Sequence, residues 1–321
     1  MAYTTIDDPS VYFQTALYTG NESTNVITND GNSDLQPDWW WGADRTGTNW
    51  NSVYDSSRGV TKQLNTNVTN SEYTVSNGMA SFNTDGFTLG SHDNSNKNSH
   101  NHVAWQWKAN GGTTASNSDG SITSTVQANT TAGFSIVTYT GTGSATTIGH
   151  GLGAVPSMII VKNRTSGSMP WTVYHKNSNA TPQNHILVLN TTAAVSDNDR
   201  FNDTAPTSSV FSVNDSASVN ENSSNHVAYV FAPIKGYSSF GSFTGTGSEN
   251  GPFVYTGFKP AWLMTKRTDG TNNWVMHDNT RDPLNETLSN NNGSNARKNL
   301  FANLSSEEDS SRGVNFYSNG F

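Results

Sequence analysis

One cluster of side chains in this sequence could contact a ligand directly. Tyr54, Asp55 and Arg58 stand close together near a segment whose composition predicts a loop. An aromatic ring, a carboxylate and a guanidinium can together stack on a ligand and exchange hydrogen bonds with it. Because loops lie on protein surfaces, we expect these three side chains to be exposed. They are therefore our candidates for ligand binding.

A second group could bind a metal. His100 and His102 form a His-x-His pair, so their imidazoles would lie on one face of a strand and could bind a transition metal. The corresponding phrase later in the chain is Ser224-Asn-His226, in which only the second histidine recurs. A single recurring histidine favours a structural hydrogen bond. We therefore predict no metal and no other cofactor, and His100 and His102 are the residues that a metal would use.

Three consecutive tryptophans, Trp39–Trp41, could form a platform on which a sugar stacks. The equivalent positions elsewhere are the apolar runs Met158–Ile160 and Trp262–Met264. Neighbouring residues of a strand face opposite sides, so a run that is apolar throughout indicates a strand buried on both faces. We therefore predict that Trp39–Trp41 belong to the core.

Catalytic groups do not converge in the sequence. Glycoside hydrolysis requires two carboxylates about 5–10 Å apart, whereas glutamates such as Glu22, Glu72, Glu221 and Glu249 are scattered along the chain. No nucleophile elbow and no phosphate-binding loop occurs. We predict no catalytic residue and no enzyme. A surface-polysaccharide depolymerase with acids on different strands stays open as an alternative.

The elements that would position these residues repeat along the chain. Three strand-like segments, Tyr12–Gly20, Phe134–Gly143 and Phe240–Gly247, each precede a proline and an apolar run. The prolines are Pro37, Pro156 and Pro260; each run ends at an arginine (Arg45, Arg164, Arg267), and a tryptophan follows (Trp50, Trp171, Trp274). The first two copies close on similar phrases, Asn101–Trp107 and Asn225–Phe231. The pattern predicts one module repeated in tandem.

The spacing of the copies sets the domain boundaries. Successive prolines lie roughly 100–120 residues apart, which is the length of a typical domain. We expect module 1 at 8–112, a Gly/Ser/Thr linker at 113–129 that ends in a possible edge strand, module 2 at 130–235 and module 3 at 236–321. Module 3 lacks a closing phrase like the other two. We expect its vacant strand position to be filled by a longer chain or by a neighbouring subunit.

Composition predicts the fold class. Hydrophobic residues are only 32%, yet the chain has 11% aromatic residues and a net charge of only −8, which argues against disorder. Asn, Ser, Thr and Gly are abundant; they disfavour helix interiors and suit strands and turns. We predict an all-β protein of tandem, jelly-roll-like β-sandwich modules with almost no helix. One short helix is expected at Ala296–Leu304, whose apolar residues could share a face.

Several classes of protein are disfavoured. The pI of about 5.4 and the absence of a Lys/Arg cluster argue against nucleic-acid binding. No stretch approaches the length of apolar residues that crosses a bilayer, so no membrane insertion is expected. The amino terminus has no basic and apolar signal-peptide pattern. The chain contains no cysteine, so no disulfide holds it together.

Four segments carry a family resemblance: Met1–Gly20, Ser81–Gly90, Asp119–Val126 and Gly149–Val161. They resemble parts of virion proteins from marine tailed phages, which are described as tail fibres or structural proteins and carry the same module in tandem. The resemblance implies a location in the virion after assembly in the host cytoplasm, with other virion proteins as partners. It brings no established catalytic site or ligand, so no functional residue follows from it.

The resemblance leads to two non-enzymatic hypotheses. The first is a tail or head fibre, or adhesin, that presents loops to a glycan of the host surface. The alternative is a capsid decoration or cement protein that binds neighbouring virion subunits. Low charge and hydroxyl-rich strands leave sheet edges poorly protected, so we also expect a homo-oligomer, with a trimer favoured for a fibre.

Overall fold

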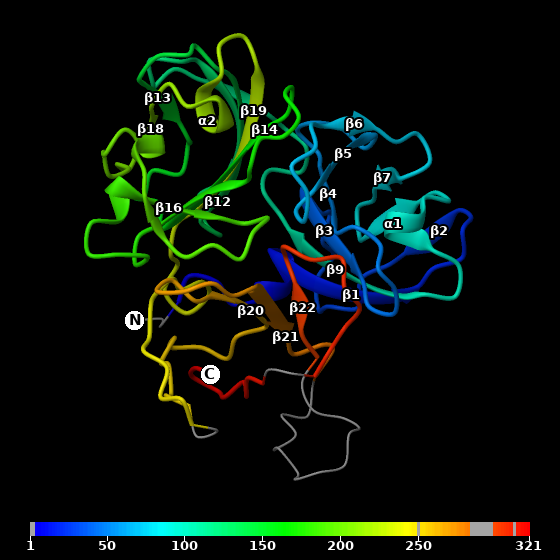
Figure 1. The fold of residues 1–321 in the computed structure, drawn as a ribbon. Helices are drawn as coiled ribbons and strands as arrows, with labels where there is room; N and C mark the ends of the chain where they lie inside the picture. Colours follow the sequence, from blue (N-terminus) through cyan, green and yellow to red (C-terminus); the bar gives the residue numbers. More distant parts are fainter. Residues whose placement is uncertain (1–3, 249–250, 283–297, 311–312) are drawn as a thin grey trace.

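The computed structural model describes residues 4–248, 251–282, 298–310 and 313–321, and it confirms the all-β class (Figure 1). In these residues helix is limited to α1 (Asp93–Asn96), α2 (Ala217–Asn220) and three 3-10 turns, η1 (Pro9–Val11), η2 (Pro182–Asn184) and η3 (Asp199–Phe201). The helix predicted at Ala296–Leu304 is wrong. Residues 296–297 lie outside the described residues, and β22 (Leu300–Phe301) pairs with β21 (Trp274–Asp278), which buries both of its side chains.

Module 1 is a two-sheet sandwich. Its second sheet has the order β2-β8-β7, with β2 (Asn25–Ile27), β8 (Phe87–Leu89) and β7 (Met79–Phe82). Its main antiparallel sheet has the order β1-β9-β3-β4-β5-β6, made of β1 (Phe13–Thr19), β9 (Asn101–Trp107), β3 (Trp39–Asp44), β4 (Ser52–Asp55), β5 (Lys62–Asn65) and β6 (Tyr73–Thr74).

Module 2 repeats this topology. A second sheet pairs β13 (Thr146–Gly149) with β18 (Val210–Val213). Its main sheet continues at one edge into β11 (Ser124–Asn129) and β10 (Ala115–Asn117), so the predicted linker at 113–129 is mostly two strands rather than a free connection. The repeated order is β12 (Phe134–Thr140), β19 (Asn225–Phe231), β14 (Met158–Asn163), β15 (Thr172–His175), β16 (His185–Val188) and β17 (Ser196–Asp197).

Module 3 has the middle of this topology. β20 (Trp262–Lys266), β21 and β22 follow one another as β3, β4 and β5 do in module 1. The segments Phe240–Gly247 and Val314–Phe321, which the repeat predicts to be strands, form no strand; single bridges join Gly320 to Tyr255 and to Tyr317. Within the described residues β20 pairs only with β21. The position that β9 and β19 fill in the other modules therefore holds no strand of the described chain.

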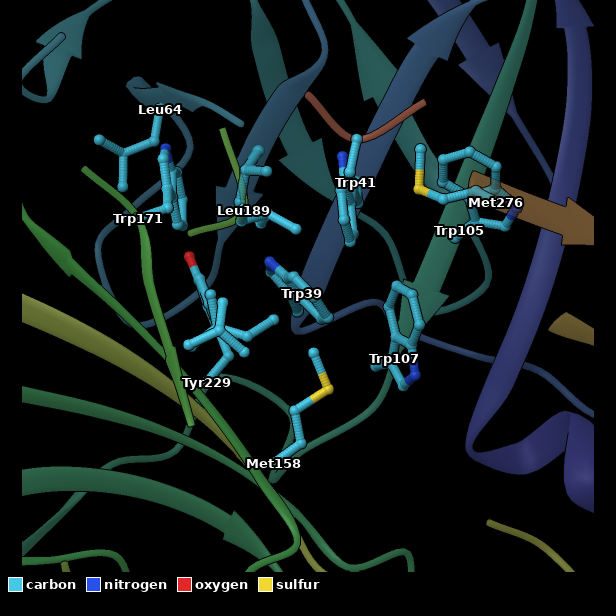
Figure 2. Packing of buried hydrophobic residues seen from close by; sticks show 14 of the residues in the cluster. Trp39, Trp41, Leu64, Trp105, Trp107, Met158, Trp171, Leu189, Tyr229 and Met276 are labelled. Atoms are coloured by element: carbon cyan, nitrogen blue, oxygen red, sulfur yellow. The ribbon is translucent and has the colours of Figure 1, made fainter. Parts of the chain in front are cut away.

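Each main sheet of modules 1 and 2 is apolar on both faces. One face packs on the module's own second sheet, as Trp40 does against Phe87. The other face meets the other modules: Trp39 and Trp41 lie in a cluster that also contains Tyr229 of module 2 and Met276 of module 3. Figure 2 shows these side chains converging from different strands. Trp39–Trp41 are thus core residues, as predicted, and the central core is shared by all three modules.

The modules contact one another in a closed ring. We call each contact between two modules a joint. In each joint a side chain at one repeat position donates a hydrogen bond to the backbone carbonyl of the last residue of β5, β16 or β22 in the next module. The donors are Trp171 Nε1 to Asn65 O (2.9 Å), Trp274 Nε1 to Val188 O (2.9 Å) and Asn51 Nδ2 to Phe301 O (2.8 Å). Module 2 thus contacts module 1, module 1 contacts module 3, and module 3 contacts module 2. The arrangement is a pseudo-threefold ring within one chain.

The strand registers correct two equivalences that the sequence predicts. Trp39, Met158 and Trp262 pair with Asp55, His175 and Asp278, so Asn51 rather than Trp50 matches Trp171 and Trp274. By the same count Thr268, not Arg267, matches Arg45 and Arg164. Its carbonyl accepts from Val195 N at 2.9 Å, as the carbonyl of Arg164 accepts from Glu72 N.

Candidate functional site

The predicted ligand-binding residues are buried, so the expectation that they are exposed is wrong. Tyr54 and Asp55 have no exposed surface and Arg58 is 8% exposed. Tyr54 donates to Gln63, and burial raises the pKa of its hydroxyl. Asp55 accepts from Arg58 N (2.8 Å), from Arg58 Nε and from Tyr229 OH (2.7 Å). Because β4 ends against module 2, Asp55 and Arg58 belong to the joint between modules, where both contact Tyr229. Tyr54 instead lies in module 1's own core, beside Trp40.

A carboxylate between two arginines completes this joint. Glu72 Oε2 accepts from Arg58 Nη1 at 2.8 Å and from Arg164 Nε at 2.9 Å. Burial alone would raise the pKa of Glu72, but the hydrogen bonds from Arg164 and the charge of Arg58 lower it below its usual value. The carboxylate therefore stays ionised at neutral pH. Sequence spacing could not reveal the network because Glu72 and Arg164 are 92 positions apart.

The same network recurs once and is replaced once. Between modules 1 and 3, Glu308 accepts from Arg45 Nε (2.9 Å) and Arg281 Nη1 (3.2 Å), and Trp105 Nε1 donates to Asp278 (2.9 Å). Between modules 3 and 2, uncharged residues occupy all the equivalent positions: His175, Ser178, Val195 and Thr268. The charged residues are thus present as a complete set or absent as a complete set. In the two joints that have it, the charged network links neighbouring modules of the ring.

The His-x-His pair is divided between two environments. His100 Nδ1 lies 2.6 Å from Asp44 Oδ2 near the surface, whereas His102 is buried and stacks on Tyr18 with ring centroids 5.2 Å apart. Burial lowers the pKa of His102 to about 4. His226 of module 2 stacks on Tyr139 in the same way, at 5.1 Å. Among the described residues no group of three His, Cys, Asp or Glu side chains is placed to hold a metal ion.

A different feature, an open hollow of about 770 Å³ on module 1, is better suited to a ligand. Its walls come from the loops that connect β3 to β4, β5 to β6, β6 to β7 and β8 to α1. Most lining residues carry amide or hydroxyl groups, and Trp50 and Tyr73 supply the aromatic rings. Asp93 is the single carboxylate among the lining residues. We call this feature the module 1 hollow.

Trp50 is the exposed aromatic ring of the hollow. It is 38% exposed, and its backbone N–H donates to Asn94 Oδ1 at 3.2 Å, which connects the β3–β4 loop to α1. The next residue, Asn51, is buried in the joint to module 3, and successive residues of an extended segment face opposite sides. The equivalent residues of modules 2 and 3 are Pro170 and Asn273. The tryptophan at position 50 is therefore not part of the repeat, and the contacts between modules do not require it.

Polar groups around Trp50 are held in place by local hydrogen bonds. Tyr73 OH donates to Asn65 Oδ1 (2.8 Å), and burial raises the pKa of this hydroxyl, so it stays protonated. Asn77 Nδ2 donates to Ser91 Oγ at 3.1 Å. Burial lowers the pKa of His92, so its imidazole is neutral at pH 7. The hollow thus offers an apolar ring face beside uncharged groups that can donate and accept.

This arrangement matches the chemistry of a sugar, which has an apolar C–H face and a rim of hydroxyls. An indole provides a flat apolar surface. Amides and hydroxyls can hydrogen-bond to a sugar hydroxyl whether that hydroxyl donates or accepts. Sequence reasoning assigned Trp50 to the repeat and missed it. The sequence contains no local signal for it, because only the strand register shows that Asn51 rather than Trp50 matches Trp171 and Trp274.

Residues 8–321 match the family described as Domain of unknown function (DUF7483). Comparison with curated proteins and with solved structures finds no match. No helix in the described part of the chain is long and apolar enough to cross a membrane. The family match spans all three modules, which agrees with a ring that shares one core. On this match the chain belongs to the DUF7483 family.

Proposed function

We propose that this protein is a non-enzymatic structural protein of a tailed-phage virion, a tail or head fibre or adhesin, which binds a host-surface glycan in the module 1 hollow. The observation that carries the proposal is the exposed Trp50 ring, which is surrounded by amide and hydroxyl side chains. The repeat does not determine the residue at this position, since the other modules have Pro170 and Asn273 there. Concave sites of this kind, with an aromatic surface and a few oriented polar groups, suit small ligands.

The charges of the hollow favour a neutral glycan. Asp93 is half exposed and is the only acidic lining residue, and His92 is neutral at pH 7. The Asp93 carboxylate, which pairs with Lys97 Nζ at 3.3 Å, can accept hydrogen bonds from sugar hydroxyls, and the lining residues include no lysine or arginine that could pair with a uronic or sialic acid. Hydrolysis by a carboxylate pair needs a second acid about 5–10 Å away. The lining therefore supports binding of neutral hexoses or N-acetylhexosamines in preference to their cleavage.

The test is titration of the purified protein with a panel of neutral and acidic oligosaccharides of bacterial surfaces. We expect Trp50→Ala to weaken binding of a neutral oligosaccharide at least tenfold, which corresponds to about 1.4 kcal/mol. Trp50→Phe, which keeps an aromatic face, should lose less. Phe253→Ala, which removes a more exposed ring (54% against 38% for Trp50) outside the hollow, is the control. Equal affinities of Trp50→Ala and Phe253→Ala would contradict the proposal.

A decoration or cement protein is the second candidate function, and one observation favours it. Module 3 exposes four large aromatic side chains and a strand edge with which no described strand pairs. Exposed apolar patches mark interaction surfaces. The virion partners and homotrimer expected from the sequence belong to this proposal. Density assigned to this chain on the virion distinguishes the two candidates, since an adhesin presents the hollow outward and a cement protein has module 3 against its neighbour.

A further inference from the structure

The edge of β20 is a vacant strand position whose occupant can be described from the other modules. In module 1, β9 lies between β3 and β1, and in module 2, β19 lies between β14 and β12. β20 is the equivalent of β3 and β14, yet its only strand partner in the described chain is β21. All of β3 and β14 is buried, whereas every residue of β20 is half-buried.

The backbone of β20 is oriented to accept another strand. Ala261 O accepts from Asn279 N at 3.0 Å, on the β21 side. Because backbone groups of an antiparallel strand alternate between its two edges, Trp262, Met264 and Lys266 present their N–H and C=O groups to the vacant edge. The equivalent residues Trp39, Trp41 and Ala43 pair there with β9.

Side chains around the vacant position also match a closing strand. In module 1 the Phe13 ring packs 4.9 Å from Trp107, and in module 2 the Phe134 ring packs 4.9 Å from Phe231. Phe240 of module 3 contacts only residues of module 2 among its described ring contacts, at 6.2–6.3 Å.

We propose that β20 is the docking site for an extended segment of another polypeptide with the pattern of β9 and β19: His-Val-Ala followed by two aromatic residues at alternate positions. The segment adds antiparallel to β20, with its last aromatic residue opposite Trp262 and the preceding one opposite Met264, as Phe231 and Tyr229 lie opposite Met158 and Ile160. Strand addition of this kind derives its affinity from main-chain hydrogen bonds and its specificity from alternate side chains.

The pseudo-threefold ring explains why this pattern, rather than any apolar strand, fits. Tyr229 OH reaches Asp55 across one joint, and Trp105 Nε1 reaches Asp278 across another. The third equivalent position is His175, whose pKa burial lowers to about 4. A neutral imidazole there can pair with a tyrosine hydroxyl from the docked segment. This proposal is independent of glycan binding in the module 1 hollow.

A peptide of residues 224–232, Ser-Asn-His-Val-Ala-Tyr-Val-Phe-Ala, is the probe. Labelled peptide is titrated into the full chain and followed by fluorescence anisotropy. We expect saturable binding at least tenfold tighter than that of a scrambled peptide of the same composition. N-methylation of the peptide at the Tyr229 position should also weaken binding at least tenfold, because that amide faces β20. Neither control changes the protein, so its fold is not at risk.

Hydrogen exchange locates the bound peptide. On binding, the amides of Trp262, Met264 and Lys266 should exchange at least tenfold more slowly. Any of three results would overturn the proposal. They are no saturable binding, equal binding of the scrambled or N-methylated peptide, and protection elsewhere with residues 262–266 unchanged.

Discussion

At the scale of single residues, the most distinctive feature is a buried histidine stacked on a tyrosine in each complete module. His102 and His226 have no exposed surface and lie nearly parallel to Tyr18 and Tyr139, at interplanar angles of 11° and 9°. Burial lowers the pKa of each histidine from 6.5 to about 4. Asp44 and Glu221, respectively, act in the opposite direction without reversing the shift. The recurring histidine is a packing residue that requires the neutral imidazole.

These shifts predict acid lability. Between pH 6.5 and about 4 the unfolded state binds protons at these histidines that the folded state does not, so stability is full above pH 6.5 and falls as the pH drops toward 4. At about 1.4 kcal/mol per pKa unit, each histidine contributes roughly 3 kcal/mol to this loss. Urea unfolding from pH 4.5 to 7.5 measures the slope. It should be shallower in His226→Gln; an unchanged slope would contradict the assignment.

At the scale of elements, the strands β3 and β14 each belong both to the sandwich of a module and to the ring of modules. Each places alternate residues on the two faces, so the strand that builds a module also builds its joint. The joint between modules 1 and 2 adds Glu72 between Arg58 and Arg164. A buried charge that loses its partner costs about 3–5 kcal/mol, whereas replacement of the whole set by neutral residues costs far less. The chain itself contains the neutral version, at the joint between modules 3 and 2.

This comparison predicts the effects of two variants. Glu72→Val leaves the Arg164 guanidinium without its carboxylate and removes one of the two carboxylates that pair with buried Arg58, so it should lower the free energy of unfolding by about 3–5 kcal/mol. The quadruple variant Asp55→His, Arg58→Ser, Glu72→Val, Arg164→Thr reproduces the neutral set of the third joint and should recover part of that loss. Denaturant unfolding of both proteins is the measurement. If the quadruple variant were less stable than Glu72→Val, the network would not act as one unit.

At the scale of the whole molecule, the main cluster of buried apolar residues includes members from all three modules. Trp171, for example, is 1% exposed and donates across the joint to Asn65 O. A module that unfolded alone would expose this cluster on its neighbours. Tandem domains with separate cores would instead unfold independently.

We therefore predict one cooperative thermal transition for the full chain, with the calorimetric enthalpy equal to the van't Hoff enthalpy. Trp171→Ala removes a buried ring at a joint, should cost about 3–5 kcal/mol, and should shift that single transition to lower temperature. As the control, Phe211→Ala removes a ring from the core of module 2 alone. Separate transitions in the wild-type chain would show that the joints do not couple the modules.

The sequence by itself determined the fold class, the strands that follow Pro37, Pro156 and Pro260, and the burial of Trp39–Trp41. These depend on local properties: turn-forming residues, alternation and runs that are apolar throughout. The repeat added the equivalence of the modules. Where the copies differ by one residue in spacing, as at Arg267 and Thr268, only the strand register resolved which residue matches.

The tertiary structure alone decided which side chains are buried at the joints and which remain exposed. The sequence predicts exposed side chains at Asp55 and Arg58 because the partner they share, Tyr229, lies 171–174 positions away. Tyr54 is buried for another reason, since it lies between the two sheets of module 1, beside Trp40. Trp50 is exposed because Asn51, its neighbour, contacts a carbonyl 250 positions further along the chain. Burial depends on how three sheets close into a ring. A local pattern contains no information on that closure, so the candidate site emerged only from the folded chain.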